Sequence, residues 1–158
     1  MTNISKFIFF LCLTFSSAFG QTQNLILTSD QNNKWLDSIK TLPLDKQLQS
    51  IKQRLLSDTN IFVRHNYPDG IKIVEQIGNR IYGDGKPALI IGGYPMIIDN
   101  KTATNKIIRL TQLLTADHIK EIGILSGKDA MTAIYGSALN GIIAMTLTKK
   151  KYLKKFRI

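Results

Sequence analysis

The sequence predicts an α+β fold in which short helices pack on a small mixed sheet, preceded by a helical segment. Three observations support this prediction. Apolar residues recur at helical spacing early in the chain, short β-branched runs bounded by glycines follow, and the last of these runs is apolar on both faces. A length of 158 residues suits one domain, and 44% hydrophobic with 20% charged residues is ordinary for a globular protein.

The first 20 residues have the composition of a secretory signal peptide. Lys6 precedes an apolar run over residues 7–15, and Ala18-Phe19-Gly20 has the small residues found at a cleavage site. A buried N-terminal strand or helix is the alternative interpretation of the same run. Cleavage after Gly20 removes Cys12, the single cysteine, so no intramolecular disulfide is expected. The sequence therefore predicts export of a mature chain that begins at residue 21.

A polar leader over residues 21–31 is expected to precede a helical segment over residues 32–58. In its first helix Trp35, Leu36 and Ile39 share one face. Its second helix repeats apolar residues at intervals of four, three and four: Leu44, Leu48, Ile51 and Leu55. Charged residues occupy other positions of that helical wheel: Asp45, Lys46, Lys52 and Arg54. We interpret the apolar stripe as a core face, with a partner groove as the alternative.

From residue 59 to 148 the pattern changes to short strands and helices. Strands are expected over residues 61–63, 71–74, 86–91, 118–125 and 141–148, and a helix over residues 102–114. A hydroxyl followed three residues later by an acid, Ser126 and Asp129, has the form of a capping box and predicts a further short helix through residue 134. Because the last strand is apolar on both faces, we expect it to be central in the sheet.

The positive charge of the mature chain is concentrated in a basic tail, residues 149–158. Six cations and no acid lie there: Lys149, Lys150, Lys151, Lys154, Lys155 and Arg157. Four interpretations are open: a solvated, frayed end, a contact for anionic lipid, a contact for an acidic partner, or a nucleic-acid arm. Nucleic acid is the weakest of these, because export separates the chain from it. The interleaved Tyr152, Leu153 and Phe156 are compatible with interfacial binding.

Catalytic, metal and cofactor signatures are absent from the sequence. His65 and His118 lack metal-spaced partners, and no serine lies in a Gly-x-Ser-x-Gly motif. The acids outside the helical segment are scattered: Asp84, Asp99, Asp117, Glu121 and Asp129. We therefore predict a non-enzymatic protein without a cofactor. The alternative is a small periplasmic enzyme whose acids converge only in the folded chain.

The last 65 or so residues resemble the plug domain of TonB-dependent outer-membrane receptors, of the type used for glycan and peptide uptake in Bacteroidetes-like bacteria. The similar segments are residues 87–96 (PALIIGGYPM), 117–125 (DHIKEIGIL), 129–137 (DAMTAIYGS) and 140–150 (NGIIAMTLTKK). The positions that carry the motif are Gly92, Gly93, Asp129, Ala130, Ala133, Tyr135, Gly136, Ser137, Asn140 and Gly141. The sequence ends where such a receptor would begin its barrel, so we expect a plug-like domain without a barrel of its own.

This resemblance implies a plug-like fold and a binding function, as an accessory or remnant of outer-membrane nutrient uptake. It places the protein in the periplasm or at the periplasmic face of the outer membrane. The implied partner is an outer-membrane barrel protein, beside the anionic lipid surface suggested by the basic tail. The motif residues are expected to be architectural, because small residues let a helix lie close to a sheet and Asn140-Gly141 favours a tight turn.

Overall fold

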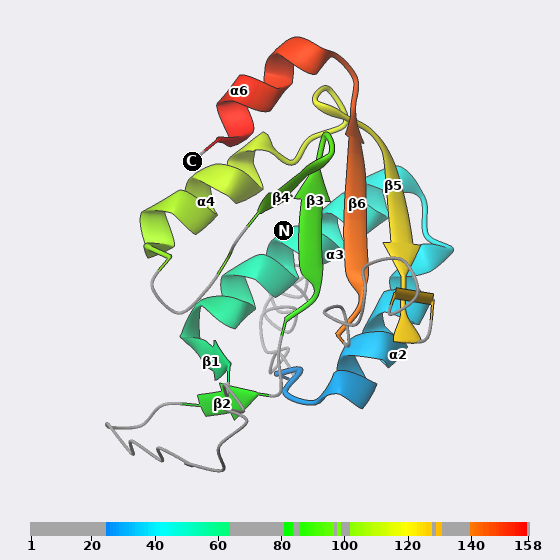
Figure 1. The fold of residues 1–158 in the computed structure, drawn as a ribbon, viewed down its shortest axis with the longest axis vertical. Helices are drawn as coiled ribbons and strands as arrows, with labels where there is room; N and C mark the ends of the chain where they lie inside the picture. The colour runs from blue at the N-terminus through cyan, green and yellow to red at the C-terminus, as the bar shows by residue number, and fades with distance from the viewer. Residues whose placement is uncertain are drawn as a thin grey trace, which may run out of the picture.

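The computed structural model describes residues 25–63, 81–83, 86–96, 98, 102–127, 129–130 and 140–157. Its centre is a four-stranded sheet in the order β4-β3-β6-β5, with helices packed against it (Figure 1). Strand β6 (Ile142–Leu147) runs parallel to β3 (Ala88–Ile91) and antiparallel to β5 (Ile119–Leu125). The prediction of an α+β fold with a small mixed sheet and a preceding helical segment is confirmed.

The helical segment consists of two helices joined by a short turn. Helix α2 (Ser29–Lys40) begins three residues earlier than expected, because the Thr28 side chain accepts from the backbone of Gln31 and the Gln31 side chain accepts in return. This reciprocal capping box satisfies two backbone donors at the helix start. Helix α3 (Leu44–Ser57) follows Pro43, a residue that is well tolerated at a helix N-terminus.

A small two-stranded sheet follows these helices. A 3-10 turn over Asp58–Asn60 leads into β1 (Ile61–Val63), which pairs in parallel with β2 (Ile81–Gly83). The expected strand over residues 61–63 is therefore confirmed. The strand expected over residues 71–74 lies outside the described residues.

Strand β3 turns directly into β4 (Tyr94–Met96) through Gly92 and Gly93. These glycines have φ of 57° and 84°, and the strands pair on both sides of them from Ile91 to Tyr94. Two consecutive residues with positive φ are the pattern of a type I′ hairpin turn, which matches the twist of the strands and which glycine adopts without strain. The glycine pair that the sequence marked as a break between elements is this turn.

The remaining elements follow the sequence pattern closely. Helix α4 (Thr104–Leu113) lies within the expected range, and β5 and β6 match the strands expected over residues 118–125 and 141–148. Strand β6 lies between β3 and β5, so the prediction that it is central is confirmed. Both of its faces are apolar because both are covered: Ile143 and Met145 lie in the main core, and Ile142 lies in a smaller cluster on the other face.

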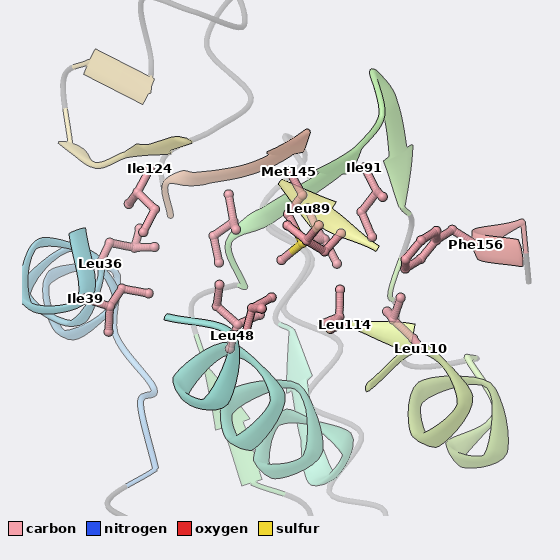
Figure 2. Close-up of a cluster of buried hydrophobic side chains, with 13 residues drawn as sticks. Leu36, Ile39, Leu48, Leu89, Ile91, Leu110, Leu114, Ile124, Met145 and Phe156 are labelled. Carbon is pink, nitrogen blue, oxygen red and sulfur yellow. The ribbon is translucent and has the colours of Figure 1, made fainter. Parts of the chain in front are cut away.

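The main core lies between one face of the sheet and the helices α2, α3 and α4, as Figure 2 shows. The helices contribute Leu36, Ile39, Leu48, Ile51, Leu110 and Leu114, and the sheet contributes Leu89, Ile91, Ile124, Ile143 and Met145. Each fully buried aliphatic side chain contributes roughly 1.5–3 kcal/mol relative to an exposed one. Because Leu48 and Ile51 are buried here, the apolar stripe of α3 is a core face and not a free groove.

The opposite face of the sheet carries a smaller apolar cluster built on Ile142 and Ala130, both buried. Partly buried Ala88, Ile90 and Leu125 pack against it. Ala130 comes from the segment that opens with the predicted capping box, most of which lies outside the described residues. The signal peptide over residues 1–20, and the leader as far as residue 24, also lie outside them. Within the described part of the chain, no helix has the length and apolarity needed to cross a membrane.

Candidate functional site: a folded basic tail and a buried arginine cluster

The basic tail is folded onto the domain. After Lys149 the chain forms a 3-10 turn, η2 (Lys150–Tyr152), which continues into a single helical turn, α6 (Leu153–Phe156). The Phe156 side chain is fully buried in the main core with Leu110 and Met145 (Figure 2). The tail is therefore anchored by an aromatic side chain, and the interpretation of a frayed end does not hold for residues 149–157.

The six cations of the tail are all exposed, although the element that carries them is fixed: Lys149, Lys150, Lys151, Lys154, Lys155 and Arg157. Tyr152 and Phe156 are four residues apart, so they share one side of the chain, and that side faces the protein. The charged residues occupy the other positions. The result is a short amphipathic element whose apolar side packs against the protein and whose charged side faces solvent.

His118 holds the tail from the side of the sheet. Its Nδ1 lies 2.9 Å from the carbonyl oxygen of Leu113, which can only accept, so this nitrogen carries the proton. The other nitrogen, Nε2, is then the acceptor for Lys155 Nζ at 3.2 Å. The His118 ring also makes an edge contact with Tyr152, with centroids 4.7 Å apart. This histidine, for which the sequence suggested no ligand role, thus orients the tail.

The hairpin turn lies against the same element. The Arg157 guanidinium stacks over the Tyr94 ring at 5.0 Å, and Tyr94 is 49% exposed. A methyl group placed on Gly92 would lie 3.3 Å from Leu153 Cδ1, which shows how closely the tail approaches the turn. Lys155 Nζ lies 4.8 Å from the Tyr152 ring centroid. Cations and aromatic rings therefore alternate over one surface made by the tail and the β3–β4 turn.

A second polar feature, the arginine cluster of Arg54, Asp58 and Asn32, was missed at the level of sequence. On the helical wheel Arg54 falls outside the apolar stripe of α3, among charged residues, yet its side chain is only 6% exposed in the structure. Its Nε donates to Asp58 Oδ1 at 2.6 Å, and its Nη2 donates to Asn32 Oδ1 at 2.7 Å. A signal was present in the sequence, since Arg54 and Asp58 stand four residues apart at a helix end.

A shallow pocket of about 180 Å³ opens beside this cluster. The Trp35 ring stacks on the Arg54 guanidinium at 5.3 Å, and both residues line the pocket. The Arg54 Nη1 atom has no acceptor among the described residues, and it is also covered from solvent. A ligand in the pocket therefore does not reach this nitrogen. We interpret the cluster as structural, tying the start of α2 to the end of α3.

Burial raises the pKa of the Asp58 carboxyl above its ordinary value of 3.8, against the opposing pull of Arg54 and Lys86. The folded-state pKa thus exceeds the unfolded one, so the stability contributed by this group is present below the unfolded pKa and is lost as pH rises through the folded pKa. We expect the stability of the wild-type protein relative to Asp58→Asn to fall as pH rises through the acidic range, from below the ordinary pKa of an aspartic acid toward neutrality. Urea unfolding of both proteins across that range measures the difference.

Asn at position 58 keeps an oxygen that can accept from Arg54, so this comparison isolates the charge. The exposed Asp117, changed to Asn, is the reference for altering an acid without burial. A difference between wild type and Asp58→Asn that stays constant, or rises with pH, would contradict the prediction.

The structure brings the motif residues to three places. Gly92 and Gly93 form the hairpin turn, Ala130 packs against Ile142, and Gly141 precedes β6 beneath Leu36. Ser29 Oγ donates to Asn140 Oδ1 at 2.7 Å, so the Asn140-Gly141 pair also anchors the start of α2. Asp129 is exposed. The remaining motif residues, Ala133, Tyr135, Gly136 and Ser137, lie outside the described residues.

Three of the acids proposed for an alternative catalytic site are among the described residues. Asp117, Glu121 and Asp129 are each exposed. Asp84 and Asp99 lie outside the described residues. Across the described part of the chain, no three His, Cys, Asp or Glu side chains gather as a metal site would require. Comparison with known proteins found no match to the chain among family models, curated proteins or solved structures.

Proposed function

We propose that this chain is an exported, non-enzymatic binding module of the plug type, which acts at the periplasmic face of the outer membrane beside a separately encoded barrel protein. The observation that supports it best concerns the three segments of the plug resemblance that form strands. Residues 87–96 provide the β3–β4 hairpin, residues 117–125 provide β5, and residues 140–150 provide β6. These strands are adjacent in a single sheet.

The chemistry of the same positions also favours an architectural role. Gly92, Gly93, Ala130 and Gly141 serve turns or close approaches in the structure, and each would be harmed by a larger side chain. None of them carries a nucleophile, base or ligand. An architectural role at these positions supports a protein that binds through the shape and charge of its surface.

Affinity capture from envelope extracts tests the proposal. The protein carries a tag after its expected signal sequence, so that the basic tail stays native. We expect it to recover one outer-membrane barrel protein in near-equal amount. Recovery of the protein alone, or with soluble proteins only, would count against the proposal.

The tail-neutral variant, Lys150→Gln/Lys151→Gln/Lys154→Gln, is the matched control, because it keeps Phe156 and its anchoring contacts while removing three charges. If the variant still captures the barrel protein, the contact is made by the folded domain. If the variant no longer captures the barrel protein, the capture by the wild type was non-specific attraction by charge. Robust turnover of an envelope substrate by the purified protein, lost on Asp129→Ala, would replace the proposal with the enzymatic alternative.

A further inference from the structure

The basic tail and the β3–β4 turn make one continuous surface. Leu153 lies against Gly92, and Arg157 stacks on the half-exposed Tyr94 ring. The six tail cations are all exposed on this element, and no acid lies among residues 149–157. Because like charges so close together repel one another, the arrangement is unfavourable in isolation and is relieved by an anionic partner.

This surface is pre-organised. Phe156 is fully buried, and His118 contacts both Tyr152 and Lys155. The cations therefore sit on a folded element instead of a mobile chain end, and less conformational entropy is lost when they meet a partner. The fixed geometry also means that the tail cannot rearrange to insert its aromatic residue, since Phe156 belongs to the core.

The kind of exposed side chain favours a bilayer surface over an acidic polypeptide. The exposed side chains are lysines, an arginine and the half-exposed Tyr94. At a bilayer surface, such amphipathic side chains direct their apolar parts toward the acyl chains and keep their polar ends among the head groups. The helical turn α6 is only four residues long, so insertion as an amphipathic helix is excluded. What remains is a peripheral, electrostatic contact with phosphate groups spread over a plane.

We propose that the basic tail, together with Tyr94 at the β3–β4 turn, is a peripheral docking surface for the phosphate head groups of an anionic phospholipid bilayer. The inference rests on the proposed function only for the compartment in which such a bilayer is met. The contact needs no barrel partner, so the two proposals can fail separately.

Co-sedimentation with vesicles tests it, using protein purified after export. Phosphatidylcholine vesicles that contain phosphatidylglycerol should sediment the protein, and pure phosphatidylcholine vesicles should not. Each cation near an anionic surface changes partitioning by about fivefold, so the tail-neutral variant, which lacks three, should bind about a hundredfold more weakly. Raising the salt to about 1 M should abolish binding of the wild type, because the Debye length then falls to about 3 Å.

A second set of three lysines provides the matched control. Lys40→Gln/Lys46→Gln/Lys52→Gln makes the same change in net charge on α2 and α3. It should bind within about twofold of the wild type, because its charges are on α2 and α3 and not on the surface made by the tail and the β3–β4 turn. Equal weakening of the two triple variants would mean that only net charge matters, and would overturn the proposal.

Tyr94→Ser tests the turn without changing any charge. It should weaken vesicle binding about threefold, and leave binding to polyglutamate unchanged, because a tyrosine ring adds affinity at a lipid interface and little toward a soluble polyanion. Unchanged vesicle binding in this variant would exclude the turn from the surface. Tight binding to polyglutamate with none to anionic vesicles would assign the tail to an acidic protein and overturn the lipid proposal.

Discussion

Gly141→Ala should destabilise the fold by about 2–5 kcal/mol. Gly141 has φ of 86°, where an L side chain is strained by about 1–2 kcal/mol. An added Cβ would lie 2.0 Å from Leu36 Cδ1 and 2.9 Å from the backbone oxygen of Leu125. The leucine could rotate away only by leaving the core, and the carbonyl belongs to β5, so overpacking adds about 1–3 kcal/mol. Urea unfolding followed by the fluorescence of Trp35, the single tryptophan, measures the loss.

Gly93→Ala is the matched control, because Gly93 has nearly the same φ, 84°, with no atom within 4 Å of an added Cβ. It should show the backbone strain alone, about 1–2 kcal/mol. Adding Leu36→Ala to Gly141→Ala should cost less than the sum of the two single changes, since the shorter side chain removes one of the two collisions. Equal losses for Gly141→Ala and Gly93→Ala would show that space at Gly141 is not limiting.

The fold class could be predicted because the elements that build it depend on short-range patterns. The spacing of Leu48 and Ile51 fixed the buried face of α3, and the apolar alternation around Ile143 and Met145 fixed the central strand. These patterns report burial directly, since a side chain that faces the core must be apolar unless it is paired. Gly92-Gly93 marked a break for a related reason, because two glycines in succession suit only a turn.

Arg54 shows where this reasoning fails. On the helical wheel it falls outside the apolar stripe with the other charged residues of α3, yet it is buried against Asp58 and Asn32. Asn32 lies 22 residues earlier in the chain, so the partner that permits burial is supplied by tertiary structure alone. Charge by itself predicts exposure, and only the hydrogen bonds that the folded chain supplies reverse that expectation.

The sequence also could not show that the basic tail is folded onto the domain. Its composition fits a frayed end as well as a surface, since a run of lysines gives no periodicity. The deciding residue is Phe156, which is fully buried among residues from α4 and the sheet. Whether an aromatic residue near a chain end finds a core depends on a space that other elements leave, and the sequence does not describe that space.

Phe156→Ala should therefore lower the free energy of unfolding by about 3–5 kcal/mol, although the residue lies near the end of a highly charged segment. Removing the ring leaves a cavity in the main core beside Leu110 and takes away the edge contact with His118 at 6.2 Å. Phe156→Leu should cost less than about 1.5 kcal/mol, because it keeps most of the apolar volume. Urea unfolding of the two variants gives the comparison, and equal stabilities would mean that the ring does not fill the core.

The same prediction decides how the tail must be studied. Deleting residues 149–158 removes Phe156 with the lysines, so we expect it to destabilise the protein at least as much as Phe156→Ala. The tail-neutral variant keeps the ring and should stay within about 0.5 kcal/mol of the wild type, because its three lysines are exposed. A deletion that leaves the unfolding midpoint unchanged would show that the tail is not part of the folded unit. If the tail-neutral variant is stable and binds vesicles more weakly, the loss of binding is caused by the missing charges. Weaker vesicle binding by the deletion variant could come from unfolding as well as from the missing charges.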